Sequence, residues 1–279
     1  MKLQYLGTAA AEGFPAVFCN CEYCQKAWET GGKNFRTRSQ SIINDELLMD
    51  FPPDTLAHFH AQGIRGDRIK YVVLTHGHAD HYYATDFLRH GSCYAHNMAE
   101  EKLQIVCSEQ LCERVQKDLA GAKKDVILEY TVAKPFIPIE LGDYTLTPFP
   151  AHHAGDSEGK LALFYAITHQ NKTLLYAHDT GYFFEEVFEY IKEKDMRFDM
   201  ISLDCTNGHL PSKPNGNHMG LNSNAAVLER LREIGAVNEQ TLLYVNHFSH
   251  NGNPLHDVLS ESAAKIGFNV SYDGLTLEV

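Results

Sequence analysis

The strongest constraint on the fold of this chain is a group of four metal-binding side chains within six consecutive positions. They are His76, His78, Asp80 and His81. The group directly follows the apolar run Tyr71–Leu74, which predicts a buried strand. Alternate residues of an extended segment point the same way, so His76 and His78 can face one metal position. Asp80 and His81 lie where the chain begins to turn and can face a neighbouring one. The segment therefore predicts a loop at a strand end that holds metal.

The length and composition of the chain predict one domain over residues 1–279. Its 279 residues are 44% hydrophobic and 22% charged, enough to build a large core. No repeat, low-complexity tract or Pro/Gly-rich linker marks a boundary. No apolar run approaches the roughly 20 residues that cross a membrane, and the start Met1–Gly7 lacks an apolar signal core. We therefore expect a soluble, cytoplasmic protein without a membrane partner.

The charge balance bears on the partners of the chain. Its 36 acidic and 24 basic residues give a formal net charge of −12, which disfavours general binding to polyanionic nucleic acid. A small-molecule partner is the simpler expectation. A homodimer is expected only on the general frequency of such assemblies.

Short runs rich in β-branched and aromatic residues alternate with helical patterns. The expected strands are Leu3–Leu6, Ser41–Ile43, Leu47–Asp50, Tyr71–Leu74, Gln104–Cys107, Val126–Tyr130, Tyr144–Phe149, Leu161–Ile167, Thr173–Tyr176, Met200–Leu203, Thr241–Val245 and Gly274–Glu278. The expected helices are Cys21–Glu29, Asp54–Gln62, Ser108–Ala120, Phe184–Lys192, Asn222–Ile234 and Pro254–Lys265. Early hairpins followed by mixed strands and helices indicate two packed sheets flanked by helices.

Further candidate ligands follow other predicted strands. His153, Asp179 and His247 each come directly or a few residues after one. Loops at the ends of neighbouring strands gather side chains at one rim of a sheet. Taken singly, each of these residues fits an ordinary surface or core position. Their order along the chain, together with the cluster at 76–81, predicts one shared site.

The motif His-x-His-x-Asp-His at 76–81 resembles the signature of the metallo-β-lactamase fold hydrolases. This resemblance implies an α/β (α+β) fold, a four-layer αββα sandwich. It implies a first metal position formed by His76, His78, His153 and Asp179. It implies a second formed by Asp80, His81, His247 and Asp179. His152 is the alternative to His153. Two divalent cations there, Mn or Zn with Fe also compatible, would share a water activated as hydroxide.

A tight cysteine cluster near the N-terminus predicts a further metal site. Cys19, Cys21 and Cys24 supply three thiolates within six positions, which suits a metal better than a disulfide framework. Tetrahedral zinc needs a fourth ligand. The alternative is three free buried cysteines. Within the metallo-β-lactamase fold, the chain resembles the phosphoribosyl cyclic phosphodiesterase subfamily of phosphonate catabolism. That resemblance implies a structural zinc completed by His250, three residues after His247.

The same resemblance suggests residues for the substrate. Arg36 and Arg38 lie in a basic stretch that can cradle a phosphate or form a solvated turn. A departing alkoxide needs a proton, and the resemblance places His218 as its donor, with His209 as the competitor. Asp80 and His218 are therefore our candidate catalytic residues. The acidic segment at 155–159 departs from the subfamily and is expected to reshape the pocket mouth.

These observations predict a metal-dependent phosphodiesterase for a small, cyclic phosphodiester. Three alternatives stay open: lactone or thioester hydrolysis, RNA 3′ processing, and a non-catalytic zinc-stabilised binding protein. The last predicts metal at the cysteine site alone. Net negative charge and the lack of a Gly/Pro-rich protruding arm count against RNA processing.

Overall fold

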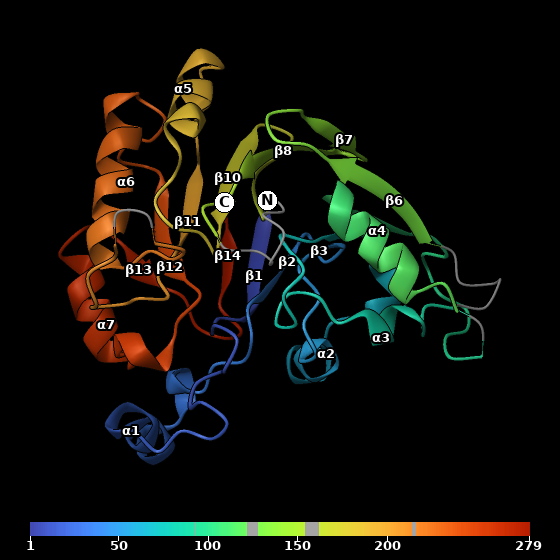
Figure 1. Cartoon of the computed structure of the whole chain (residues 1–279), viewed down its shortest axis with the longest axis horizontal. Helices are drawn as coiled ribbons and strands as arrows, with labels where there is room; N and C mark the ends of the chain where they lie inside the picture. The colour runs from blue at the N-terminus through green and yellow to red at the C-terminus, as the bar shows by residue number, and fades with distance from the viewer. Residues whose placement is uncertain (92, 122–127, 154–161, 214–215) are drawn as a thin grey trace.

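The chain forms two β-sheets packed face to face, with helices on both outer faces (Figure 1). The computed structural model describes residues 1–91, 93–121, 128–153, 162–213 and 216–279. This architecture is the expected four-layer αββα sandwich, so the predicted metallo-β-lactamase fold is confirmed. No helix in these ranges is both long and apolar enough to span a bilayer.

The first sheet has seven strands in the order β14-β1-β2-β3-β4-β5-β6. Their bounds are β14 Thr276–Glu278, β1 Lys2–Gly7, β2 Gln40–Ile43, β3 Leu47–Met49, β4 Tyr71–Val73, β5 Leu103–Ser108 and β6 Leu128–Ala133. Pairing is antiparallel from β14 to β3 and parallel from β3 to β6.

The second sheet also has seven strands, in the order β13-β12-β11-β10-β9-β8-β7. Their bounds are β13 Asn269–Val270, β12 Leu242–Asn246, β11 Met200–Asp204, β10 Lys172–Ala177, β9 Leu163–His169, β8 Tyr144–Pro150 and β7 Ile139–Leu141. Pairing is parallel from β13 to β10 and antiparallel from β10 to β7. The carboxyl ends of β8, β10, β11 and β12 therefore meet at one edge.

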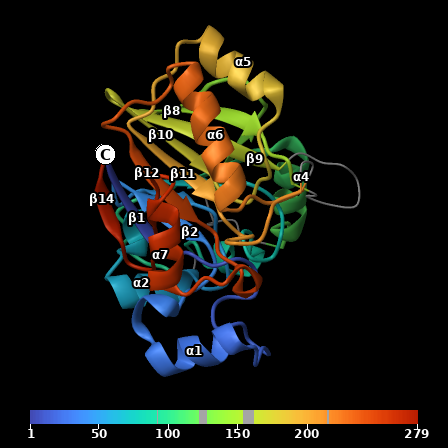
Figure 2. The ribbon, with the colours of Figure 1, turned by 90° about the vertical axis from the view of Figure 1, so that its left-hand side faces the viewer.

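Helices cover the outer face of each sheet. The helices of the described residues are α1 Glu22–Thr30, α2 Thr55–Gln62, α3 Ala84–Phe87, α4 Glu109–Asp118, α5 Glu185–Glu193, α6 Leu221–Glu233 and α7 His256–Ala264, with short 3₁₀ turns η1 Gly32–Asn34, η2 Gly66–Arg68 and η3 His250–Gly252. The helices α2, α3 and α4 lie on the side of the first sheet, and α5, α6 and α7 on the side of the second. Figure 2 shows α1 projecting away from the sandwich.

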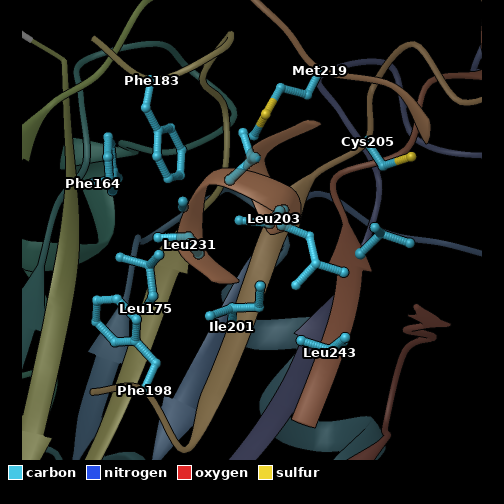
Figure 3. Close-up of a cluster of buried hydrophobic side chains, with 14 of the residues drawn as sticks. Phe164, Leu175, Phe183, Phe198, Ile201, Leu203, Cys205, Met219, Leu231 and Leu243 are labelled. Carbon is cyan, nitrogen blue, oxygen red and sulfur yellow. The ribbon is translucent and has the colours of Figure 1, made fainter. Parts of the chain in front are cut away.

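Strand alternation distributes the apolar side chains between layers. Along β10, Leu174 and Tyr176 pack between the sheets, whereas Leu175 and Ala177 face the helices. Figure 3 shows the cluster under the helices, where Leu175 and Leu203 lie close to Leu231 of α6. Buried apolar surface on both faces fixes the strand register, because a slip of one residue would exchange the two faces.

Sequence analysis did not predict two short strands and one short helix. The strands β7 and β13 have three and two residues, and α3 has four, too few to show a period. The expected strands Val126–Tyr130 and Leu161–Ile167 begin in segments outside the described residues, and their remaining parts form β6 and β9. The other expected strands and helices are present with small shifts at their ends.

Candidate metal centre and active site

The first ligand set lies where the loops after β4, β8 and β10 meet. It consists of His76, His78, His153 and Asp179. His78 Nδ1 lies 2.9 Å from His76 Nε2 and 3.2 Å from His153 Nε2. His76 Nε2 is 3.1 Å from Asp179 Oδ2. Ligand atoms at about 2.0–2.1 Å from one tetrahedral cation are roughly 3.3 Å apart, so this spacing fits a single cation.

The second set adjoins the first and shares one residue with it. It consists of Asp80, His81, Asp179 and His247, all buried. His81 Nε2 lies 3.3 Å from Asp80 Oδ2 and 3.2 Å from Asp179 Oδ2. It is also 3.2 Å from His247 Nε2. The structure thus brings together all seven residues that the sequence suggested for the paired positions.

Asp179 is the group common to both sets, and its surroundings fit a bridging ligand. Burial alone would raise the pKa of this carboxyl, but the imidazoles of His247, His218 and His76 lower it well below its usual value. Its Oδ1 atom is buried and lies 3.0 Å from His218 Nδ1 and 3.3 Å from His153 Nδ1. A buried carboxylate is costly unless its charge is compensated. Two cations shared by this carboxylate would supply that compensation.

The histidines of the first set are held in the form that binds metal. Burial lowers the pKa of His153 to about 4 and also lowers the pKa values of His76 and His78. Neutral imidazole is the ligand form, so these three rings need not lose a proton when a cation enters. Burial alone would lower the pKa of His81 as well, but the carboxylates of Asp50 and Asp80 outweigh it and raise this pKa well above its usual value. A cation at the second position would take the place of that proton.

Three residues of the centre adopt left-handed backbone conformations. Asp50, Asp179 and His247 have φ angles of +63°, +55° and +64°. Such conformations are costly for residues other than glycine and persist where the surroundings over-determine them. Asp179 directly follows the residue after β10, and His247 directly follows β12. The chain therefore turns sharply at each strand end, which directs both side chains into the same centre.

Two polar groups that sequence analysis missed fix the second set. Asp50 Oδ2 lies 2.7 Å from His81 Nδ1, while Asp50 Oδ1 accepts hydrogen bonds from the backbone and hydroxyl of Thr75. Thr206 Oγ1 lies 2.7 Å from His247 Nδ1. A partner on the second ring nitrogen orients an imidazole and leaves Nε2 for metal. The only signal for Asp50 was its place at the end of a predicted buried strand.

The two sets open into a cavity of about 360 Å³. Its walls include His78, Asp80, His153, Asp179 and His247 together with Ala10, Ala11, Glu12, Thr206, Asn207, His218, Ser249 and Asn251. A volume of this size suits a small substrate. The segment 155–159, expected to reshape the mouth, lies outside the described residues.

His218 reaches the rim of this cavity from the loop before α6. Its Nδ1 lies 3.0 Å from Asp179 Oδ1 and 3.4 Å from Asp204 Oδ2. Burial alone would lower the pKa of His218, but Asp179 and Asp204 raise it to about 10. Asp204 also accepts hydrogen bonds from the backbone of Thr206 and Met219, which ties the loop to β11. Asp179, Asp204, His218 and His247 form an overlapping set that is also close enough for one cation.

Two alternatives from the sequence lie away from the centre. His209 Nδ1 is 3.2 Å from the carbonyl of Gly252, and His209 Nε2 is 3.0 Å from Ser262 Oγ. Both of its ring nitrogens are therefore engaged outside the cavity. The ring of His152 stacks on Phe184 at 4.9 Å, so the structure places His153 rather than His152 among the candidate ligands.

The expected phosphate-binding role of Arg36 does not fit its position. Its side chain is only 2% exposed, and its guanidinium donates to Thr8 Oγ1 and to the carbonyl of Ser271. The group also lies 4.4 Å from the ring of Phe248, next to His247. Arg36 is therefore a buried structural residue behind the centre.

Arg38 also lies outside the cavity lining. Its Nη1 pairs with Asp54 at 2.9 Å, and its Nε donates to the carbonyl of Ala11. The first contact ties Arg38 to the start of α2, and the second ties it to the N-terminal segment. The basic stretch at 36–38 thus anchors the chain in this structure.

The cysteine cluster and His250 form a separate four-ligand set. Cys19, Cys21, Cys24 and His250 offer four atoms within 4.8 Å of one another. His250 Nδ1 is 3.3 Å from Cys19 Sγ and 3.6 Å from Cys21 Sγ. Burial would raise the pKa of Cys21, but the hydrogen bonds with His250 and the backbone of Cys24 lower it to about 6. Three sulfurs and one nitrogen at this spacing fit structural zinc.

The four-layer sandwich and the histidine–carboxylate sets at its rim define the class, a metallo-β-lactamase fold protein with residues fit for divalent metal. Residues 46–247 match the family described as Beta-lactamase superfamily domain. The chain belongs to that family.

Known proteins support the fold across the whole chain. Coenzyme PQQ synthesis protein B of Stutzerimonas stutzeri is 24% identical over 325 aligned positions that cover 100% of both chains. A diphosphatase from the PhnP family superimposes with a TM-score of 0.74 at 21% identity, covering 100% of this chain and 97% of that one. Zn(2+)-bound PqqB from Methylobacterium extorquens gives 0.75 at 20% identity with 100% of both covered. At 21% and 20% identity, these two structures support the fold of this chain and not its activity.

Proposed function

We propose that this chain is a metal-dependent phosphodiesterase that hydrolyses a small, cyclic phosphodiester. The observation that carries the proposal is the pair of ligand sets sharing Asp179 at the floor of the cavity. Zn, Mn and Fe all suit histidine and carboxylate donors. The structures similar to this chain include a PhnP-family diphosphatase, which is in keeping with phosphoryl chemistry.

Two divalent cations, when bound, supply Lewis acidity to the phosphoryl oxygens and lower the pKa of a water between them. The chain itself holds the centre rigid. Asp50 and Thr206 fix the rings of His81 and His247, and the left-handed turns fix Asp179. Preorganised ligands of this kind reduce the reorganisation needed when the substrate arrives.

His218 is the proposed general acid for the departing oxygen. Its Nδ1 side faces Asp204, which belongs to neither of the paired sets, so Asp204 can keep a proton on that nitrogen. His218 Nε2 is then the nitrogen available to a substrate oxygen at the cavity wall. Asp204 acts as the positioning residue of this pair.

The test compares substrates and variants in one assay. Wild type is given bis(p-nitrophenyl) phosphate, a cyclic nucleotide and a lactone, beside Asp80→Ala, His218→Ala and His209→Ala. We expect phosphodiester hydrolysis that Asp80→Ala abolishes and that His218→Ala lowers by roughly 10²-fold or more. His209→Ala is the matched control and should retain activity, because its ring lies outside the cavity. Hydrolysis of the lactone alone would refute the proposal.

A second candidate function is a step in coenzyme PQQ synthesis. It is favoured by the full-length similarity to proteins named coenzyme PQQ synthesis protein B. Restoration of PQQ production in a strain that lacks its own protein B, by wild type but not by Asp80→Ala, would favour this candidate. Failure to restore it while phosphodiesters are hydrolysed would remove it.

A further inference from the structure

Two buried polar residues stand directly before two of the candidate metal ligands. His178 precedes Asp179 at the end of β10, and Asn246 precedes His247 at the end of β12. Their side chains are 1% and 0% exposed. Neither belongs to a ligand set or lines the cavity. Buried polar groups cost free energy unless they are fully hydrogen-bonded, so their place beside two ligands calls for a reason.

The two side chains contact each other across the strand that separates them. Asn246 Nδ2 donates to His178 Nδ1 at 3.1 Å. His178 Nε2 then carries the proton and donates to Ser202 Oγ of β11 at 2.7 Å. Because β11 pairs with both β10 and β12, this link joins the ends of two strands that do not pair with each other.

Further hydrogen bonds hold the link in place from both sides. Ser271 Oγ donates to Asn246 Oδ1 at 2.6 Å, and Asn246 Nδ2 also lies 3.3 Å from Ser39 Oγ. Tyr5 Oη lies 2.7 Å from Ser202 Oγ, which connects the link to the first sheet. The side-chain amide of Asn246 is therefore restrained at both ends.

The link bears directly on the second metal position. Asp179 and His247 both occupy left-handed conformations, where the chain turns at a strand end. The direction of each side chain therefore depends on how the backbone of the preceding residue is held. Asp179 Oδ2 and His247 Nε2 are 3.9 Å apart, a separation that one cation spans. A shift at either strand end would change this separation. The ligands on the loop after β4 would not follow the shift.

We propose that His178 and Asn246 are positioning residues that set the spacing of Asp179 and His247 and thereby the affinity of the second metal position. The inference rests on the proposed function, because that position is one half of its paired centre. Partners of metal ligands contribute roughly 10–100-fold to affinity in other sites. The effect here passes through the backbone of the adjacent residue.

The experiment measures Mn²⁺ affinity in protein whose cysteine site is filled with zinc. Hard Mn²⁺ disfavours thiolates and so reports on the paired centre. Free Mn²⁺ is followed by electron paramagnetic resonance for wild type, His178→Ala, Asn246→Ala and the double variant. We expect each single variant to weaken one of the two Mn²⁺ sites by roughly 10–100-fold and to leave the other near its wild-type affinity. The double variant should be no weaker than either single variant, because both remove the same link.

Two further variants separate positioning from general damage to the core. Tyr144→Phe removes only a hydroxyl that contacts Asn44 and Glu46 at the start of β8, outside the link, and is expected to leave Mn²⁺ affinity within about twofold of wild type. His178→Gln keeps a side chain able to accept from Asn246 and is expected to restore most of the affinity. Asn246→Ser replaces the alanine variant if that one fails to fold.

The outcomes distinguish the inference from the function on which it rests. If wild type binds no pair of divalent ions at this centre, whether Mn²⁺, Zn²⁺ or Fe²⁺, the proposed function and this inference both fail. If wild type binds two and the single variants bind them equally well, only this inference fails. Losses that multiply in the double variant would also overturn it, because His178 and Asn246 would then act separately.

Discussion

The two candidate metal sites of this chain are assembled in opposite ways, although the loop after β12 contributes to both. The paired centre collects its ligands from loops after β4, β8, β10 and β12. The cysteine site takes three of its four ligands from six consecutive residues and the fourth from His250. One site therefore depends on the whole fold, and the other mainly on a local turn.

The difference in assembly matches a difference in chemistry. The cysteine site offers four ligands for one tetrahedral ion, which leaves no place for water. The paired centre shares Asp179 between two sets and opens into a cavity of about 360 Å³. Carboxylates and hydroxyls on the far side of its rings, such as Asp50 and Thr206, hold the ligands in place. The cysteine site, with all four positions filled by protein ligands, therefore suits a structural ion. The paired centre, which opens to a cavity and has its ligands held by further hydrogen bonds, suits a reaction.

The largest expected effect comes from Asp179→Asn, which weakens the shared ligand. An amide oxygen carries no charge to offset two cations, so both paired positions should lose metal. We expect activity to fall by roughly 10³-fold or more while zinc remains at the cysteine site. Elemental analysis of protein purified without chelator measures how much metal remains at the paired centre and at the cysteine site, and a hydrolysis assay measures the activity. Unchanged metal content would mean that Asp179 bridges nothing.

The cysteine site gives the next largest effect, on stability. Cys24→Ser removes a buried thiol from the four-ligand set and is expected to abolish zinc binding there. We expect a loss of about 3 kcal/mol or more in the free energy of unfolding, which is a fall of about 6 °C or more in Tm. Differential scanning calorimetry with and without chelator checks this. A variant as stable as wild type would show that the cluster holds no structural ion.

Arg36 and Arg38 sharpen the contrast between anchoring and substrate binding. Arg36→Ala leaves a buried hydroxyl and carbonyl without their donor and should lower the free energy of unfolding by about 2–3 kcal/mol. The partly exposed ion pair of Arg38 with Asp54 should contribute about 1 kcal/mol or less. Neither Arg36→Ala nor Arg38→Ala should change KM for a phosphodiester by more than about twofold. A large rise in KM for Arg38→Ala would show that Arg38 binds the substrate.

The smallest effect concerns the thiols of the metal-free cysteine site. At Cys21, hydrogen bonds with His250 and the backbone of Cys24 outweigh the effect of burial and lower the thiol pKa to about 6. At Cys24, burial raises the thiol pKa to about 12. Iodoacetamide at pH 7 should therefore label Cys21 and spare Cys24. Because the folded pKa of Cys21 lies below its unfolded value, its stabilising contribution is full above about pH 9 and is lost as pH falls through about 6. Mass spectrometry of labelled peptides reads the selectivity, and equal labelling would contradict it.

Sequence analysis singled out the candidate ligands but not the groups that orient their rings. His76, His78 and His81 stand out because three imidazoles crowd one strand end. Asp50 and Thr206 did not stand out, since a single carboxylate or hydroxyl at a strand end resembles any residue that ends a strand. Their roles depend on which ring lies opposite, and only the packing of the two sheets decides that.

The same limit applies to Arg36, which the structure places outside the cavity lining. A short basic stretch before a strand fits a phosphate cradle as well as a solvated turn, and the structure shows a third arrangement. Arg36 is buried because Thr8 and Ser271, far away in the sequence, supply acceptors for it. The two-sheet sandwich, in contrast, was predictable because strand alternation and helical periods repeat along most of the chain.

The central claim is that two cations meet at Asp179. The most direct test is anomalous diffraction from crystals grown with Mn²⁺. The account predicts two anomalous peaks roughly 3.5–4 Å apart, one against His76, His78 and His153 and the other against Asp80, His81 and His247, with Asp179 touching both. A centre without such peaks, or with these side chains pointing apart, would contradict it.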